Sequence, residues 1–428
     1  VTVVLALLTL VFAVIPGTRG LGVSAAAGLL VALAAVLFAL PPLLAVCGRG
    51  IFWPFIPRPG ELERGPGLWH RMAAGVMRAP GRSLMAGLAL LAIMASGLIG
   101  TTVGLDQLEK FHVPSESAAG LEVLSEHFPA GEAQPILIVA NTEQADEVIA
   151  AVEDVDGILR AHPTAETDDG TLTTIMATGE YAPGSDDSLA QIAELRDAVH
   201  AVPGADALVG GPTATEVDAR AGNAHDLWLI APLVLAVSFA VLVLLLRSLV
   251  APVVLLALNI ASALAAIGAG AWLSRMLFEQ HALDLQVPLL SFLFLVALGI
   301  DYTIFLVHRA RTEARTHGTR AGMVRAVAHT GGVITSAGIV LAGVFAALGV
   351  LPLVTLGQLG LIVGVGVIVD TLVVRTVIVP AVFGLLGDRI WWPARPPRAD
   401  DAQADVTGDA SPDAQPESAG MEPATTRG

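Results

Sequence analysis

The sequence has very little cysteine, tyrosine or charge for its length. Among 428 residues, Cys47 is the single cysteine, two residues are tyrosine, and 14% are charged. One cysteine cannot form an internal disulfide, and no Cys/His spacing is typical of zinc. No Ser/His/Asp grouping and no carboxylate pair fixed by spacing is present, so an enzyme is the weakest interpretation. We expect no metal, no cofactor and no nucleic-acid partner.

Long apolar runs make up most of the chain instead. Hydrophobic residues are 54% of the composition, and the mean hydropathy is +0.71. A bilayer core about 30 Å thick requires ~20 apolar residues in a helix. Eight runs reach or approach this length: 1–15, 21–46, 83–103, 227–246, 249–273, 287–307, 332–350 and 356–386. The sequence therefore predicts an α-helical polytopic membrane protein with about eight transmembrane helices, the first two joined by a turn at 16–20.

Charges are separated by sign along the chain. Residues 48–82 hold six Arg against two Glu, and residues 308–329 hold five Arg against one Glu. Residues 104–226 hold 24 acidic residues against four basic ones. The positive-inside rule places the two Arg-rich segments, expected as loops, in the cytoplasm and the acidic segment outside the cell membrane. The Pro-, Asp- and Ala-rich segment 394–428 is predicted to be a disordered cytoplasmic tail.

The acidic segment 104–226 has the pattern of a folded α+β domain. Strands are predicted at 135–141, 157–163, 171–179 and 205–211, and helices at 142–155 and 188–202. The order β-α-β-β-α-β is that of ferredoxin-like folds. Its acidic side chains are interpreted as a solvated face, with contacts to cations or lipid headgroups as the alternative.

These patterns divide the chain into six segments. They are 1–46, two transmembrane helices that end a first repeat; 47–82, a cytoplasmic linker; 83–103, a transmembrane helix; 104–226, the extracytoplasmic domain; 227–393, a five-helix transmembrane bundle; and 394–428, the tail. The repeat is an ungapped match between PPLLAVCGRGIFWP (41–54) and PAVFGLLGDRIWWP (380–393). Because the first copy has only two spans before it, we expect the sequence to begin inside a first repeat; an unusual start codon is the alternative.

One acidic residue lies well inside the apolar run 287–307. At ~1.5 Å per residue, Asp301 is roughly 21 Å from Val287 and 12 Å from Arg309. Insertion scales put such a group at about 2.5–3.5 kcal/mol unfavourable, so it must face a bundle interior or water. Either Asp301 and its neighbour Tyr302 relay protons, or the carboxylate is buried without a role in transport.

A second pair of intramembrane charges, Asp370 and Arg375, lies in the last apolar run. Intramembrane charges are least costly when paired. Proton relay and structural lock are both open interpretations of this pair. Thr335 and Ser336, one turn into the run 332–350, are interpreted as polar helix-packing residues.

Three segments resemble a known family. VPLLSFLFLVALGIDYTIFLVHRARTEA, HTGGVITSAGIVLAGVFAAL and GVIVDTLVVRTVIVPAVFGLLGDRIWWP are similar to the MMPL transporters (mycobacterial membrane protein large) of the resistance–nodulation–division (RND) superfamily. The resemblance covers residues 1–395. It implies an RND-type bundle of twelve spans in two halves, each half with an outer domain. By the same resemblance, Asp301 and Tyr302 match the proton-relay pair of the tenth helix, and Asp370 and Arg375 match a charged pair in the last.

The resemblance implies a proton-motive-force-driven exporter of lipids or other hydrophobic compounds in the plasma membrane. Its expected partners are membrane lipids, a hydrophobic substrate and protons. The family's first four helices and first outer domain have no counterpart here, so we expect either a fragment that lacks its N-terminal half or a separate polypeptide that supplies it. A homo-oligomer is a further possible partner. The alternative is a non-transporting membrane scaffold whose outer domain binds a lipid or protein partner.

Overall fold

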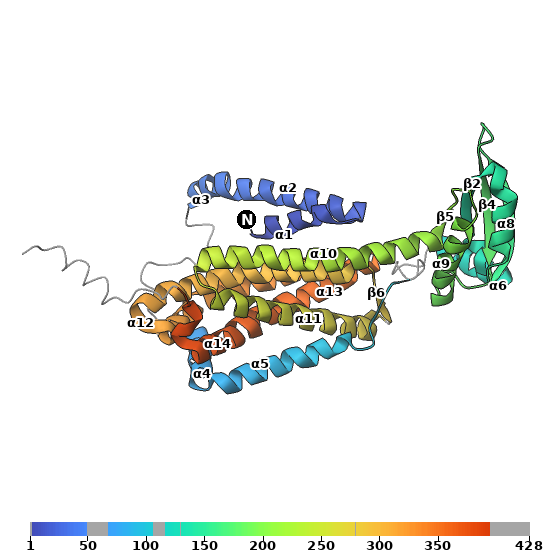
Figure 1. Cartoon of the computed structure of the whole chain (residues 1–428). Coiled ribbons are helices and arrows are strands. Elements are labelled where there is room, and N and C mark those ends of the chain that lie inside the picture. Colours follow the sequence, from blue (N-terminus) through green and yellow to red (C-terminus); the bar gives the residue numbers. More distant parts are fainter. Residues whose placement is uncertain (1, 49–66, 106–115, 129, 279, 394–428) are drawn as a thin grey trace, which may run out of the picture.

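A computed structural model describes residues 2–48, 67–105, 116–128, 130–278 and 280–393. Long helices form a bundle, and a small α+β domain stands beyond one end of it (Figure 1). Within the described ranges, six helices are long and apolar enough to cross a membrane, and the shorter Thr2–Phe12 is apolar too. The six are Pro16–Cys47, Pro80–Leu98, Pro212–Leu246, Val250–Phe278, Val287–Leu348 and Val354–Trp391.

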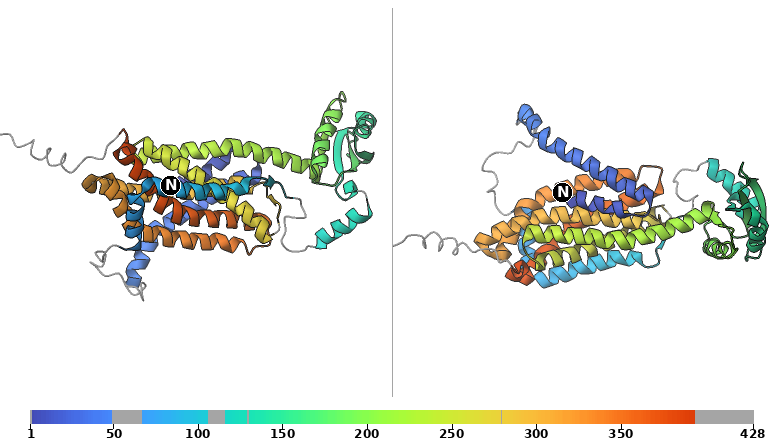
Figure 2. Two further views of the ribbon diagram at one scale, coloured as in Figure 1. Left: turned by 90° about the horizontal axis from the view of Figure 1, so that it is seen from below. Right: turned by 45° about the horizontal axis from the view of Figure 1, so that its top comes forward.

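The helices outside the α+β domain come from both ends of the chain. In order they are α1 (Thr2–Leu8), α2 (Pro16–Phe38), α3 (Leu40–Cys47), α4 (Leu68–Arg78), α5 (Pro80–Ala95), α10 (Pro212–Leu246), α11 (Val250–Phe278), α12 (Val287–Leu348), α13 (Val354–Val369), the π-helix η7 (Asp370–Ile378) and α14 (Val379–Leu386). Short 3₁₀ segments are η1 (Thr9–Phe12), η4 (Ser96–Leu98) and η8 (Gly387–Trp391). The centre of the bundle is where α12 and α13 pack together. The fully buried residues there include Leu293, Val296, Ile362 and Val363. By contrast, none of the most apolar stretch of Pro16–Cys47 is buried, and this helix stands apart from the bundle (Figure 2).

The helix α12 is two helices joined at Gly318, whose φ of 77° and ψ of 163° break the helical path. The halves run side by side, because the rings of Phe294 and Phe345 contact each other with centroids 6.0 Å apart. The prediction of an Arg-rich loop at 308–329 is therefore wrong: the segment is helical on both sides of one glycine. Charged residues can stabilise a helix through ion pairs between neighbouring turns. Here Arg309 and Glu313, four residues apart, form such an ion pair at 2.7 Å, which favours a helix over a loop.

Two further predicted connections are also helical. The turn expected at 16–20 is the first turn of α2, because proline is favoured at the start of a helix. The residues just before α2 are held by α10. The buried carboxylate of Asp226 on α10 accepts hydrogen bonds from the backbone N–H groups of Val14 (2.7 Å) and Ile15 (3.3 Å).

The linker predicted at 47–82 contains α4, which buries Ala73 and Val76 along one side. An amphipathic helix can lie against a bundle even where the sequence is rich in arginine. Residues 49–66 of that linker, and the tail predicted at 394–428, lie outside the described residues.

The outer domain contains a four-stranded sheet. Its strands are β2 (Ile136–Asn141), β3 (Ile158–Glu166), β4 (Leu172–Gly179) and β5 (Leu208–Gly210). The spatial order is β3-β4-β2-β5, and all neighbours are antiparallel. Alternate residues such as Ile138 and Ile175 pack on α8 (Ala145–Glu153) and α9 (Asp186–His200) in a core separate from that of the bundle. The chain order of these elements is the predicted β-α-β-β-α-β; α6 (Glu116–His127) and α7 (Ala130–Ala133) precede them.

The helix α10 joins the two parts. The prediction started this span at residue 227, but α10 begins at Pro212, inside the outer domain, and continues through the bundle (Figure 1). Arg196 of α9 donates to both carboxylate oxygens of Asp218 of α10, at 2.8 and 2.9 Å. Bidentate pairing fixes orientation as well as distance. The outer domain is thus attached to the bundle through one continuous helix. A second, short connection pairs β1 (Thr102–Val103) with β6 (Ala282–Leu283) in parallel.

The two copies of the internal repeat share a backbone conformation at their aligned glycines. The aligned residues Gly48 and Gly387 follow α3 and α14, and both have positive φ, 60° and 53°. Both copies therefore end a helix in the conformation that favours glycine. The remainder of the first copy, residues 49–54, lies outside the described residues.

Substitution at Gly318 tests the break in α12. The φ/ψ values of Gly318 fall in a region that is essentially restricted to glycine, so Gly318→Ala should destabilise the protein by roughly 1–3 kcal/mol. Gly343, in the second half of the same helix, has open space for a side chain, and Gly343→Ala should be neutral or stabilising by up to ~1 kcal/mol. Thermal unfolding of both purified variants measures the difference; equal effects would contradict the break.

Candidate functional site

The arginine Arg375 lies in the bundle core on η7. Its side chain is 2% exposed. The Nη2 group donates to the Asp370 carboxylate and, at 3.2 Å, to the Gly299 carbonyl oxygen on α12. The guanidinium carbon lies 4.6 Å from the centroid of the Tyr302 ring, a cation–π contact. One arginine therefore ties its own helix to the first half of α12.

The π-helix explains how Asp370 and Arg375 meet. Residues five apart in an α-helix point about 140° away from each other, at ~100° per residue. A π-helix bonds residue i to i+5 and so brings such residues to one face. The stretch Asp370–Ile378 is π-helical, and the Arg375–Asp370 ion pair lies within it. The sequence pairs these two charges, but its apolar pattern does not reveal the π-helix.

Burial makes this ion pair sensitive to the loss of either partner. Asp370 is 8% exposed, so both groups have left water. The penalty is several kcal/mol per ion, and close pairing with added hydrogen bonds is needed to offset it. The Gly299 carbonyl and the Tyr302 ring supply added contacts to the cation.

Asp301 faces a different helix from Tyr302. Its carboxylate interacts with the hydroxyl of Thr2 on α1, whereas Tyr302 packs on Arg375. Asp301 is half-buried and does not line the cavities beside Arg375. Neighbouring helical residues project about 100° apart, which accounts for the separation. Of the first predicted pair, Tyr302 therefore contacts the second pair through Arg375, whereas Asp301 lies on the side of α1.

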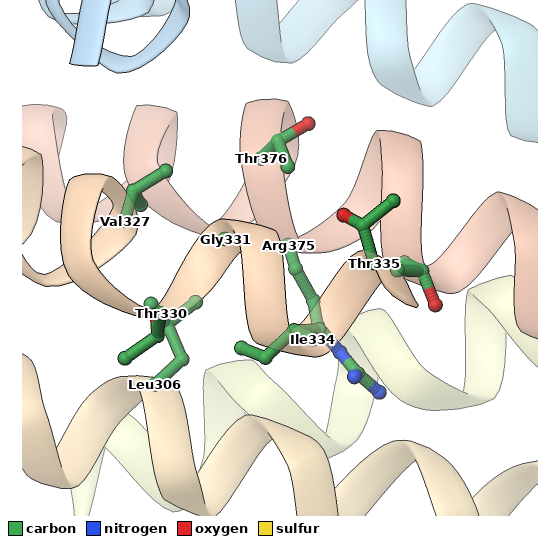
Figure 3. A pocket seen from close by; sticks show the side chains of 9 residues that line it. Leu306, Val327, Thr330, Gly331, Ile334, Thr335, Arg375 and Thr376 are labelled. Atoms are coloured by element: carbon green, nitrogen blue, oxygen red, sulfur yellow. The ribbon is translucent and has the colours of Figure 1, made fainter. Parts of the chain in front are cut away.

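Thr335 and Ser336 differ in their surroundings. The hydroxyl of Thr335 is buried and has no hydrogen-bond partner among the described residues; it lies beside Arg375 (Figure 3). The hydroxyl of Ser336 donates to the Val333 carbonyl of its own helix at 3.0 Å. Neither hydroxyl bonds another helix within the described chain, and the packing role of both remains a prediction.

Sequence reasoning missed several polar residues around Arg375. Thr330, Thr371 and Thr376 line the same cavity as Thr335, a space of about 10 Å³. Thr371 directly follows Asp370 and Thr376 directly follows Arg375, and this adjacency is the signal that could have found them; Thr330 lies far from the pair in sequence. In the described part of the chain, no group of three or more His, Cys, Asp or Glu side chains could hold a metal ion.

Comparison with known proteins decides the family. The MMPL family profile matches residues 1–83 and 116–407. This chain belongs to the MMPL family. A putative membrane protein of Streptomyces coelicolor is 43% identical to the MMPL chain over 408 residues, a match that covers 92% of this chain and 57% of that protein. The apo-petrobactin exporter of Bacillus anthracis is 31% identical over 388 residues, covering 84% of this chain and 52% of that protein. The MMPL chain therefore spans little more than half the length of these relatives.

A solved structure shares the fold. SecDF, a translocon-associated membrane protein from Thermus thermophilus, matches this MMPL chain with a TM-score of 0.50 at 15% identity, covering 90% of this chain and 47% of that one. At this identity the likeness concerns the fold alone. The MMPL chain is thus a mostly helical membrane protein with a SecDF-like fold.

Removing one partner of the buried pair should be more harmful than removing both. Arg375→Met leaves Asp370 buried and uncompensated, and should destabilise the MMPL protein by about 3–5 kcal/mol. Adding Asp370→Leu should recover much of that loss. Arg196→Met, which breaks the exposed pair with Asp218, should cost no more than ~1 kcal/mol. Thermal unfolding in detergent measures all three; a double variant no more stable than Arg375→Met would contradict the pairing.

Proposed function

We propose that this MMPL protein belongs to a transporter that exports lipids or other hydrophobic compounds and is driven by inward proton flow. The observation that carries the proposal is Asp301, a half-buried acid in the apolar helix α12, whose carboxylate interacts with the hydroxyl of Thr2 on α1. Intramembrane acids of this kind mark proton relays in pumps and transporters. The Bacillus anthracis relative is named as an exporter, which supports the direction of transport.

The two intramembrane acids have separate roles in this proposal. Asp370 is held in the ion pair with Arg375 and acts as a structural lock. Asp301 gains and loses the transported proton, and Tyr302 connects it to the locked pair through its contact with Arg375. The engagement of its carboxylate by Arg375 supports the structural-lock interpretation of Asp370 over proton relay.

Protonation of Asp301 would change its contacts with α1 and so shift the packing of α1 against α12. A proton can drive such a shift only by the difference in its affinity for the two states. The capping contact of Asp226 links the start of α2 to α10. Because α10 continues into the outer domain, a movement of these helices would reach that domain.

The topology follows the charge distribution. The break within α12 separates two halves that turn back at the end of the bundle away from the outer domain (Figure 1). We place the Arg-rich end in the cytoplasm and the acidic domain outside the plasma membrane. Eight spans result when each half of α12 is counted as one span and Thr2–Phe12 as another. The sheet order β3-β4-β2-β5 supports a ferredoxin-like outer domain.

The unburied apolar surface of α2 supports a partner within the membrane. The relatives are nearly twice as long as this chain, so we propose an N-terminal half or a second copy as the occupant.

A scaffold without transport is the second candidate. The outer domain has its own hydrophobic core, so it could bind a lipid or protein by itself. In that case the isolated residues 104–226 would keep the activity, and uncouplers would have no effect on it.

Replacement of Asp301 tests the transport proposal. Asp301→Asn removes the titrating group but keeps size and polarity, so export by the complete protein should be abolished at normal expression. Asp168→Asn, an exposed acid of the outer domain, is the matched control and should leave export unchanged. Export and membrane abundance are measured in the same cells. Normal export by Asp301→Asn would rule out this residue as the proton carrier.

A further inference from the structure

Arg375 has hydrogen-bond donors that no described residue uses. A guanidinium carries five N–H donors. The two N–H groups of Nη2 donate to the Asp370 carboxylate and the Gly299 carbonyl oxygen. By contrast, Nε and Nη1 are buried and have no hydrogen-bond partner among the described residues. Buried donors are normally satisfied by protein or by ordered water.

Two small cavities meet at this side chain. One is lined by Gly299, Tyr302, Asp370, Thr371 and Arg375 together with apolar residues. The other is lined by Leu306, Thr330, Ile334, Thr335 and Thr376, and it shares Thr371 and Arg375 with the first (Figure 3). The unpartnered hydroxyl of Thr335 belongs to this second cavity.

The cavities are arranged along the bundle axis. In the first half of α12, the residues of the first cavity end at Tyr302 and the second cavity begins at Leu306, nearer to Gly318. In α13 and η7, Val367 and Asp370 line the first cavity alone, while Thr376 lines only the second. We therefore call them the outer cavity and the inner cavity. Arg375 lies between them.

The size and charge of the cavities identify the ligand as water. Each has a volume of about 10 Å³, close to the space that one water molecule needs. The charge of Arg375 is already balanced by Asp370, so a neutral ligand is favoured over an anion. In the inner cavity a water molecule would find a donor on Arg375 and the hydroxyl of Thr335, the two partners that a buried water requires.

We propose that Arg375 holds one water molecule in each cavity, and that the inner water bridges its guanidinium to the Thr335 hydroxyl. The other cavity-lining threonines are bonded already: Thr330 donates to Ala326 and Thr371 to Val367, at 2.7 and 2.6 Å. Thr335 is therefore the positioning residue of the inner water. The two waters solvate the ion pair from both ends and extend a polar column from Tyr302 toward the Gly318 end of the bundle.

X-ray hydroxyl-radical footprinting of the complete protein in lipid bilayers tests the water site directly. Radicals form from water, so buried side chains are oxidised only where water is bound beside them. Leu306 and Ile334 line the inner cavity and are 1% and 4% exposed, whereas Leu293 of the same helix is fully buried and lines neither cavity. We expect several-fold faster oxidation of Leu306 and Ile334 than of Leu293. Equal rates at the three residues would overturn the proposal.

A variant series separates the bridge from simple packing. Thr335→Val keeps the side-chain volume but removes the hydroxyl, and should reduce oxidation of Leu306 toward the rate of Leu293. Thr9→Val is the control, since this buried hydroxyl donates to the Ala6 carbonyl at 2.6 Å and lines neither cavity. Unchanged oxidation of Leu306 in Thr335→Val would overturn the bridging role.

We also propose that protons move inward along this polar column, a step that rests on the proposed function. In that case Thr335→Val should slow export several-fold with normal expression, and Thr9→Val should not. Fast oxidation of Leu306 together with normal export by Thr335→Val would overturn the route and leave the water site intact. Loss of transport in Asp301→Asn without faster oxidation of Leu306 would overturn the water site and leave the proposed transport function intact.

Discussion

The ion pair between Arg375 and Asp370 is the constraint on which the bundle core depends. Two opposite charges are held in an apolar interior, where the penalty for leaving water is several kcal/mol per ion. The π-helical stretch brings the two residues to one face, and the Gly299 carbonyl and the Tyr302 ring complete the contacts of the cation. The first half of α12 is thereby tied to η7, and this attachment orients Asp301 toward α1.

In the proposed function, this arrangement separates the ion pair in the bundle interior from Asp301, the acid proposed to exchange protons. Asp301 lies next to Tyr302 in sequence but contacts the first helix of the chain, whose packing is less extensive than that of α12 and α13. Asp226 then connects the start of α2 to α10, and α10 continues into the outer domain, where Arg196 and Asp218 lock it. These contacts form a chain from Asp301 to the α+β domain beyond the end of the bundle, which is the path that the proposed movement would follow.

The sequence predicts the parts of this structure that follow from hydropathy and periodicity. The long apolar helices, the β-α-β-β-α-β order and the importance of the intramembrane charges are visible there, because burial and alternation leave direct patterns. The helical hairpin at Gly318 and the helix α4 were predicted as loops, because arginine-rich composition indicates topology and not local conformation. The π-helix and the unpartnered Thr335 hydroxyl depend on tertiary packing around Arg375, for which no local pattern exists.

The roles proposed for the two intramembrane acids can be tested directly. Infrared difference spectra of the purified protein in lipid, recorded on acidification, report the carbonyl stretch of each carboxylic acid that takes up a proton. If Asp301 exchanges protons and Asp370 stays ionised beside Arg375, a band should appear that is lost in Asp301→Asn and kept in Asp370→Asn. A spectrum that Asp301→Asn leaves unchanged would contradict the central claim that this carboxylate is the group that carries the proton.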